Sequence, residues 1–430
     1  MNRRYLIYGL LFFLTVLNYF HRVVLSIAMP SLSLEYGLDP AAQGWLLSSF
    51  LWSYVLLLIP GGVLLDRWGT RRLTAAAVGF WSLATAAAAL PFGYIFLIFT
   101  RVMVGVGMAP TFPASVRAVR EWAPMRERAW ATAFFQAGPA FGTATSAVIV
   151  GWMISMAGWR TAFAASGALG VIWVVVWLIF FRQPAEARWL GEPERRMILA
   201  ERSPGGTAGR GLSMTDLVRY RTMWGLFIAQ GCINYTQYLA LTWLPSYLVR
   251  SRGLNLMSSG VDLAIIYLGA CAVTLLAARV SDAMLTEQAV RQGKRRNMVA
   301  FFCVVSSVML IVPFMTSTWA LVLALMLSLA GVQSALTNTY SLISDVVRDG
   351  GGIGKAVGWL QLGGNTFGIV APIATGYIIA ITGSYTSAFV SAGVLLLIGA
   401  VVALTMTRQP VGEIAIAGGH DLSAVSGVAP

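Results

Sequence analysis

The sequence predicts an all-α membrane protein in which twelve transmembrane helices form two pseudo-symmetric bundles of six. Its composition carries the first part of this prediction, since 57% of the 430 residues are hydrophobic and only 11% are charged. The mean hydropathy of +0.73 points the same way, because a water-soluble domain is far more polar. The apolar residues also fall into runs of about 20 residues, the length at which a helix crosses a bilayer. Lipid offers the backbone no hydrogen-bond partners, so each run must fold as a helix, and the alternating pattern of a membrane barrel is absent.

The twelve predicted helices are separated by short polar segments. They cover residues 6–29, 42–65, 73–90, 92–116, 127–152, 160–181, 222–249, 258–284, 297–315, 318–345, 353–380 and 384–407. The first helix is expected to be a span and not a cleavable signal peptide. Its apolar run is too long, and His21 and Arg22 stand where a small-residue cleavage site would be needed.

A long polar stretch after the sixth helix divides the chain. We expect a six-helix half over residues 1–181, a cytoplasmic linker over 182–221, a second six-helix half over 222–407 and a disordered cytoplasmic tail over 408–430. Within the linker, residues 192–202 predict a short amphipathic helix on the membrane surface, followed by the flexible fragment "SPGGTAGRG".

The two halves carry related charged motifs, which indicates an internal repeat. The fragment "GGVLLDRWGTRR" follows the second helix, and a degenerate counterpart, "ARVSDAMLTEQAVRQGKRR", follows the eighth. Two repeated halves are typical of carriers that expose a central site to each side of the membrane in turn.

The positive charges predict the orientation. Of the 30 Lys and Arg residues, only Arg160, Arg250 and Arg252 lie in the loops of one side. Because cytoplasmic loops are enriched in Lys and Arg, both termini are expected to be cytoplasmic. This topology accounts for the net charge of +13, so no nucleic-acid partner is predicted, and the partner that surrounds the chain is the lipid bilayer.

The loop after the second helix resembles the signature of the major facilitator superfamily, and "RVMVGVG" resembles the fourth-helix pattern of that family. The resemblance implies a conformational latch, in which the acid accepts charge-assisted hydrogen bonds and a glycine permits a tight turn. The residues assigned to this latch are Gly62, Asp66, Arg67, Gly69, Arg71 and Arg101.

Four further fragments resemble the anion:cation symporter branch, which includes bacterial galactonate, hexuronate and phthalate transporters. They are "NYFHRVVLSIAMP", "APTFPA", "LTWLPSYL" and "GGNTFGIVAP". The resemblance implies secondary active transport of a small organic anion, a carboxylate, across the bacterial inner membrane by a monomer. Transport needs no covalent chemistry and the sequence holds no catalytic constellation, so we expect no enzyme activity, no catalytic residue, no metal and no cofactor.

The first helix carries a cation that lipid would not tolerate. Asn18, His21 and Arg22 are spaced i, i+3 and i+4, so we expect them to share one face that looks toward a polar cavity. A guanidinium suits a carboxylate because it can donate two parallel hydrogen bonds, and by resemblance Arg22 is the anion-binding residue. The alternative is that Arg22 extends to the outer membrane surface. Further substrate-binding candidates, mostly taken from the resemblance, are Tyr19, Tyr54, Asn234, Tyr238, Gln361 and Asn365.

The chain departs from proton-coupled members at two acids. The resemblance places an Asp at the position of His21 and a Glu at that of Met108, and none of the 17 Asp and Glu residues lies near the middle of a predicted span. One hypothesis is that His21 carries the proton, because its charge changes near neutral pH. The alternatives are an anion exchanger or exporter with a neutral His21, or a membrane sensor that binds without flux. The apolar Met108 and Pro139 favour an aromatic or partly apolar carboxylate over a sugar acid.

Overall fold

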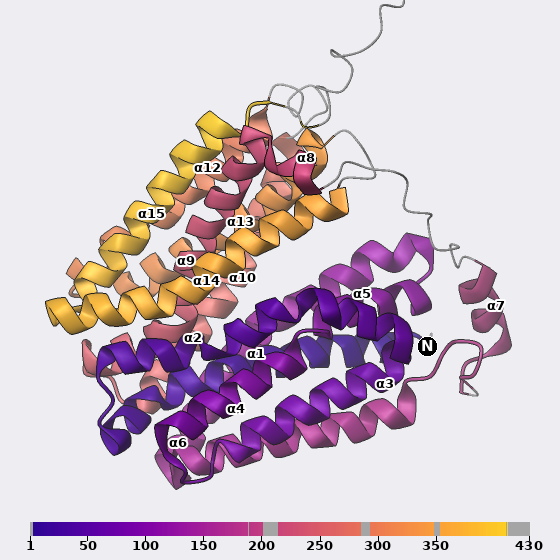
Figure 1. Cartoon of the computed structure of the whole chain (residues 1–430), viewed down its shortest axis with the longest axis horizontal. Coiled ribbons are helices and arrows are strands. Elements are labelled where there is room, and N and C mark those ends of the chain that lie inside the picture. The colour runs from indigo at the N-terminus through magenta and orange to yellow at the C-terminus, as the bar shows by residue number, and fades with distance from the viewer. Residues whose placement is uncertain are drawn as a thin grey trace, which may run out of the picture.

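A computed structural model of the chain describes residues 3–187, 189–200, 214–284, 293–347, 353–409 and 411. Every regular element in these ranges is a helix, apart from one isolated bridge between Val347 and Val411. Figure 1 shows the helices in two bundles, one indigo to magenta and one pink to yellow. The predicted all-α fold of two six-helix bundles is therefore confirmed.

The first bundle begins at residue 5. Its elements are α1 (Tyr5–Tyr36), α2 (Pro40–Leu56), α3 (Leu58–Ala87), α4 (Gly93–Met108), α5 (Thr111–Trp122), η1 (Met125–Glu127) and α6 (Arg128–Phe180). The start of α2 follows simple capping rules, because Asp39 accepts a hydrogen bond from the amide of Ala42 at 2.7 Å and Pro40 occupies the first turn.

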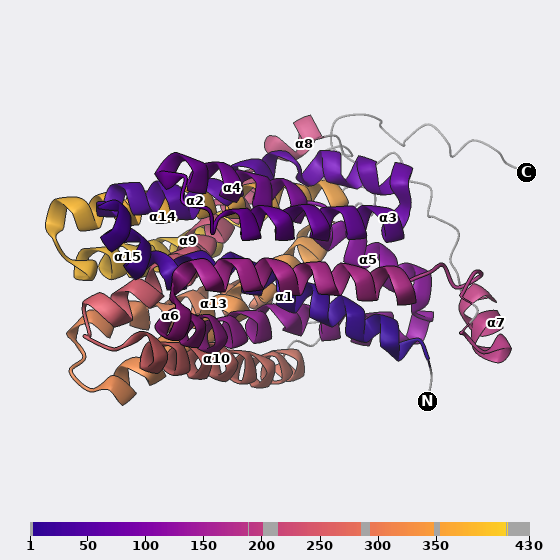
Figure 2. The same cartoon turned by 90° about the horizontal axis from the view of Figure 1, so that it is seen from below.

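The second bundle follows two short linker helices, α7 (Glu192–Ala200) and α8 (Met214–Val218). Its elements are α9 (Arg221–Arg250), α10 (Leu256–Met284), α12 (Lys294–Ser306), η2 (Ser307–Leu310), η3 (Val312–Phe314), α13 (Thr318–Val346), α14 (Ile353–Thr382) and α15 (Tyr385–Met406). In Figure 2 the helices of both bundles run along the long direction of the molecule.

The helix α3 reverses direction at Gly69, where the backbone has φ of +72°. Gly61 lies against Pro110, and 16 residues later Ala77 lies against Gly107. A straight helix would separate Gly61 from Ala77 by about 24 Å, whereas their partners are three residues apart. The end of the second span and the third span are therefore joined by a turn of a single glycine, which tolerates positive φ without steric cost.

The helix α6 reverses in the same way at Gly158, where φ is +78°. Ser146 donates a hydrogen bond to the carbonyl of Phe20 at 3.1 Å, and the carbonyl of Ser166 lies 2.8 Å from the ring of the next residue, His21. Ser146 and Ser166 are twenty residues apart, which in a straight helix would be about 30 Å, yet they contact neighbouring residues of α1. The fifth and sixth spans are thus antiparallel neighbours that both pack along α1.

These reversals explain the number of spans. By length and composition, eight helical segments in the described ranges can cross a membrane, or nine if the bent pair α2 and α3 is one span. The turns at Gly69 and Gly158 add one span each. The one span still to be counted is α9, which is too polar to meet the same criterion but packs against α14 and α15. The total agrees with the twelve predicted helices.

The linker helix predicted for residues 192–202 is present as α7, and residues 201–213 lie outside the described residues. Figures 1 and 2 both show α7 beyond the end of the first bundle. It is held there by the buried Arg4, which pairs with Glu194 at 2.9 Å and with Glu127 at 2.8 Å. At the start of the tail, the Val411 amide donates a hydrogen bond to the carbonyl of Val346 in α13 at 2.9 Å. Residues 412–430 lie outside the described residues.

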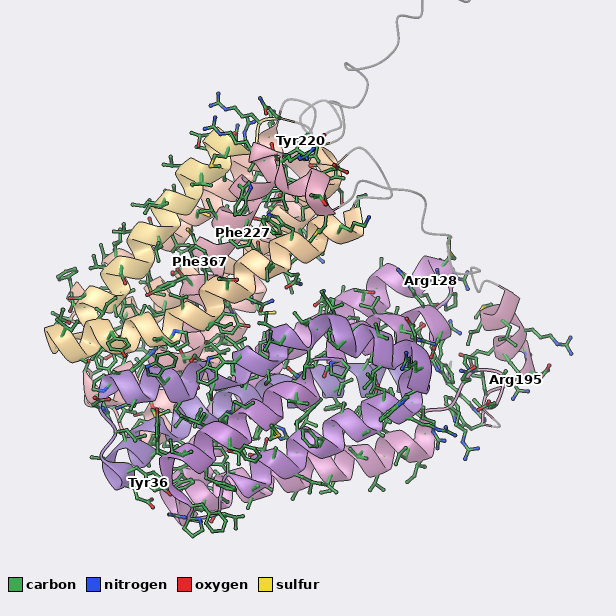
Figure 3. All side chains as sticks on the ribbon, viewed as in Figure 1. Tyr36, Arg128, Arg195, Tyr220, Phe227 and Phe367 are labelled. Atoms are coloured by element: carbon green, nitrogen blue, oxygen red, sulfur yellow. The ribbon has the colours of Figure 1, made fainter. Side chains whose placement is uncertain are left out.

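The two bundles meet at the end of the molecule opposite the linker. There α2 packs along α14 and α6 along α10, Arg250 donates a hydrogen bond to Ser33, and the Trp45 indole lies 3.4 Å from the Tyr377 hydroxyl. Figure 1 shows the bundles diverging toward the end that carries α5, α7 and α8. In Figure 3, Tyr36 lies at the joined end, and Arg128 at the opposite one.

Candidate functional site

The side chain of Arg22 leaves α1 near the middle of the membrane-spanning helix and is 9% exposed. Its guanidinium carbon lies 4.9 Å from the ring centroid of Tyr19, 5.3 Å from that of Phe50 and 4.8 Å from that of Tyr54. Contacts of this kind are favourable because the face of an aromatic ring is electron-rich. Arg22 is therefore enclosed by rings from α1 and α2 and does not extend to the membrane surface.

A second arginine lies near the same Phe50 ring. Arg101 on α4 is 1% exposed, its guanidinium carbon is 5.9 Å from the Phe50 ring, and Nη1 donates to the carbonyl of His21 at 3.3 Å. The Nε atoms of Arg101 and Arg22 are buried without a hydrogen-bond partner. Arg101 was grouped with the latch in the sequence prediction, but it lies in the middle of the bundle.

The two arginines are not balanced by acids. The ion pairs formed within the described residues involve neither Arg22 nor Arg101. A buried charge without a counter-ion costs several kcal/mol even after the protein relaxes. An anion placed beside these guanidinium groups would recover part of that cost through charge-assisted hydrogen bonds.

His21 lies in a different environment from that of Arg22. It is fully buried, Nδ1 lies 3.0 Å from the indole nitrogen of Trp81 and Nε2 lies 2.8 Å from the carbonyl oxygen of Ser166. An indole nitrogen can only donate, so Nδ1 accepts and Nε2 carries the hydrogen that the Ser166 carbonyl accepts. The ring is neutral in this arrangement and uses both of its nitrogens.

The shared face expected for His21 and Arg22 does not bring their side chains together. Consecutive residues of a helix point about 100° apart, and here His21 faces α3 and α6 while Arg22 faces α2. Arg22 also interacts with the hydroxyl of Tyr238 on α9. Arg22 is thus directed at the second bundle, and His21 is enclosed within the first. Proton carriage by His21 stays a prediction.

The second bundle contributes polar side chains from α9 and α14. Tyr238 is 8% exposed and Asn365 is 7% exposed, and the amide of Asn365 donates to the carbonyl of Gln361 at 2.9 Å. Asn234 lies so close to α14 that a Cβ on Gly364 would come within 2.4 Å of its Nδ2 atom. A Cβ on residue 368 of α14, also a glycine, would come within 2.7 Å of the Tyr238 ring.

The close packing of α9 on α14 therefore depends on two glycines one helical turn apart. It places Asn234 and Tyr238 of α9 against α14, the helix that carries the other two candidates predicted in this half, Gln361 and Asn365.

Three residues near the site were not predicted. Phe50 lies near both guanidinium groups and one helical turn before Tyr54, so i, i+4 spacing could have identified it. Tyr340 on α13 interacts with Tyr19, Tyr54 and Gln230, and Gln230 is 1% exposed with no partner for Oε1. No signal in the sequence separates these last two from packing residues.

The predicted latch residues lie at the end where the bundles diverge. Asp66 pairs with Arg117 of α5 at 2.9 Å, and Arg117 also bonds Glu121 at 3.0 Å. Glu121 accepts a further hydrogen bond from Thr70 at 3.0 Å. These bonds connect the ends of three spans within the first bundle.

The other predicted latch residues lie nearby. Arg71 donates to the carbonyl of Leu178 at 2.5 Å, Arg67 is exposed, Gly62 is half-buried, and Gly69 forms the turn described above. The hydrogen-bond and ion-pair partners described above for this group all belong to the first bundle. A latch between the two halves therefore stays a prediction.

Comparison with known proteins identifies the family. The family model described as Major Facilitator Superfamily matches residues 11–347 and 289–425. The chain belongs to the major facilitator superfamily. This confirms the resemblance carried by "GGVLLDRWGTRR" and "RVMVGVG".

Two relatives cover nearly the whole of this superfamily member. It is 30% identical over 418 residues to the probable galactarate/D-glucarate transporter GudP of Escherichia coli (strain K12), with 92% of each chain covered. It is 31% identical over 407 residues to the hexuronate transporter of Bacillus subtilis (strain 168), with 94% of each chain covered. These relatives agree with the symporter branch indicated by the four shorter fragments.

A solved structure shows the same fold. The chain superimposes with a TM-score of 0.73 on a bacterial homolog to the human lysosomal transporter Spinster in an inward-facing and occupied conformation. The identity is 16%, and the match covers 94% of this chain and 97% of the other.

Proposed function

We propose that this protein is a secondary active transporter that moves small organic anions, carboxylates, across the bacterial inner membrane by alternating access. One observation carries the proposal: the guanidinium carbons of Arg22 and Arg101 lie 5.3 Å and 5.9 Å from the centroid of the Phe50 ring, and both groups are buried without an acid partner in the described residues. A substrate carboxylate supplies the missing charge. Arg22, which faces the second bundle, is its primary partner, because a guanidinium can donate two parallel hydrogen bonds to one carboxylate.

The conformation described above supports alternating access. The halves formed by residues 1–181 and 222–407 touch at the end marked by Ser33 and Arg250, and they diverge at the end of the linker. If the termini are cytoplasmic, as the distribution of Lys and Arg predicts, this state is open to the cytoplasm. Rocking of one half against the other would open the site to the opposite side.

Sugar acids are the first candidates for the transported carboxylate. The relatives that are 30% and 31% identical are named as transporters of galactarate or D-glucarate and of hexuronate. The argument from Met108 for a less polar site is weakened, because Met108 is fully buried in an apolar cluster with Val104 and Trp81. Aromatic acids are second candidates, because the rings of Tyr19, Phe50 and Tyr54 surround Arg22.

Thermal-shift titration followed by uptake tests this function. The purified protein is titrated with D-glucarate, D-galactarate, D-galactonate, D-glucuronate, phthalate and benzoate, and the anion that stabilises it most is then offered to proteoliposomes. We expect saturable uptake that unlabelled anion inhibits. Binding without any flux would favour the sensor, and stabilisation by none of the six would contradict the proposed carboxylate site.

A further inference from the structure

We infer that this transporter is an obligatory anion exchanger, in which the empty site cannot change its side of access and a second organic anion must be carried back. The inference rests on the proposed transport function and specifies how the same site is coupled. It follows from the charge that the site holds when no anion is bound.

The empty site contains two positive charges close together. The guanidinium carbons of Arg22 and Arg101 lie 5.3 Å and 5.9 Å from the centroid of the same Phe50 ring. Arg101 has one hydrogen bond to a carbonyl, that of His21, and each arginine has a buried Nε without a partner. Guanidinium groups stay charged at any physiological pH. The charge of the empty site therefore has to be tolerated or compensated.

No titratable group beside the arginines can compensate it. The titratable groups that interact with them are His21 and Tyr19 from α1, Tyr54 from α2 and Tyr238 from α9. Tyrosine is neutral near pH 7. Neutral His21 would add positive charge if it took up a proton, and both of its ring nitrogens are already bonded. Within the described residues, no carboxylate from these helices pairs with either arginine.

Closing the end at which the two bundles diverge makes this charge more costly. In the present conformation the two bundles diverge at one end, and Arg22 keeps 9% of its surface exposed. An occluded intermediate removes the remaining water and lowers the local dielectric, so two uncompensated cations repel each other more strongly. A bound carboxylate removes this penalty. Because only the loaded site can pass through occlusion cheaply, each change of access requires an anion.

The membrane potential adds to the argument. Net entry of an anion alone is opposed by an inside-negative potential. The titratable groups beside the arginines include no carboxylate that could bring in a compensating proton. Exchange of one anion for another of equal charge moves no net charge. Proton carriage by His21 is the competing hypothesis, and one experiment separates the two.

The experiment compares uptake into two sets of proteoliposomes that contain the intact protein. One set is loaded with the anion chosen by the thermal-shift titration, and the other contains only buffer with an impermeant zwitterion. Potential and pH gradients are first abolished with ionophores and then imposed. We expect uptake about tenfold or more faster into the loaded set, unchanged by an inward proton gradient.

The outcomes are distinguishable. Equal uptake into both sets, or accumulation in the unloaded set driven by protons or potential, would overturn obligatory exchange and leave the transport function intact. Absence of uptake in both sets would refute the transport function and the inference with it.

A pair of variants at one position tests the physical cause. Arg101→Gln removes one of the two cations, so the ratio of net uptake to exchange should rise about tenfold. Arg101→Lys keeps the charge and should preserve exchange, even if its affinity falls. If both variants keep the parent ratio, the charge of the empty site is not the cause of the coupling. The comparison uses a ratio, so a shared loss of expression does not affect it.

Discussion

The indole nitrogen of Trp81 donates a hydrogen bond to Nδ1 of His21 over 3.0 Å, and the opposite ring nitrogen of His21 bonds the carbonyl of Ser166. The pair joins α1 to α3 and α6 inside the first bundle. It also separates the roles of two adjacent residues, because His21 is held in the core while Arg22 faces the second bundle. The predictions below follow from this division.

Arg22→Lys should weaken anion binding by about ten- to a hundredfold, because a charge-assisted hydrogen bond contributes about 1.5–3 kcal/mol and an ammonium cannot donate in the bidentate geometry. Arg22→Ala should abolish detectable binding. The measurement is thermal-shift titration with the stabilising anion. Arg196→Lys, on the exposed face of α7, is the matched control and should bind as the parent does. Parent-like affinity in both Arg22 variants would exclude Arg22 from the site.

Trp81→Phe should lower the stability of the folded protein by about 1–3 kcal/mol, because it leaves Nδ1 of His21 buried without a donor. His21→Gln should destabilise less, since an amide can retain one of the two bonds. The thermal midpoint in detergent reports both effects. If His21 carries the proton instead, His21→Gln would abolish accumulation driven by a proton gradient and leave counterflow of anion intact.

Gly364→Ala should displace the Asn234 side chain, which packs between α9 and α14, since the added Cβ would lie 2.4 Å from Nδ2 of Asn234. Overpacking of this kind costs about 1–3 kcal/mol, and we expect reduced thermal stability together with weaker anion binding. Gly358→Ala is the matched control on the same helix, because a Cβ there has nothing within 4 Å. That change should be neutral or slightly stabilising. Equal effects of the two substitutions would rule out the close approach as the cause.

A cross-link between Ser33→Cys and Arg250→Cys through a bifunctional, reducible thiol reagent should trap the conformation described above, because the long Arg250 side chain reaches Ser33 across the joined end of the bundles. The background must first lose the free cysteines Cys232, Cys271 and Cys303. Cross-linking should stop transport while binding from the open side persists, and a reductant that cleaves the cross-link should restore transport. Unimpaired transport by fully cross-linked protein would show that this end need not open.

Much of the fold could be predicted from the sequence. The length and apolarity of the runs determine twelve helices, since a backbone in lipid has to bond within its own segment. The connections could not be predicted as closely. The end of the second span joins the third through Gly69 alone, and the fifth span joins the sixth through Gly158 alone. Whether a glycine in an apolar helix continues it or reverses it depends on the neighbours that the chain packs against on its return.

The candidate site, too, could be predicted from the sequence only in part. The sequence by itself determined that α1 carries a cation which must avoid lipid, because no apolar surroundings can solvate a guanidinium. It also determined that acids are scarce in the spans. Only the tertiary structure decided that Trp81 and Ser166 occupy both nitrogens of His21, and that Arg101 and Arg22 lie near the same Phe50 ring. Helix formation depends on neighbours within a few residues, whereas these contacts join helices tens of residues apart, so their partners are chosen by packing and not by local sequence.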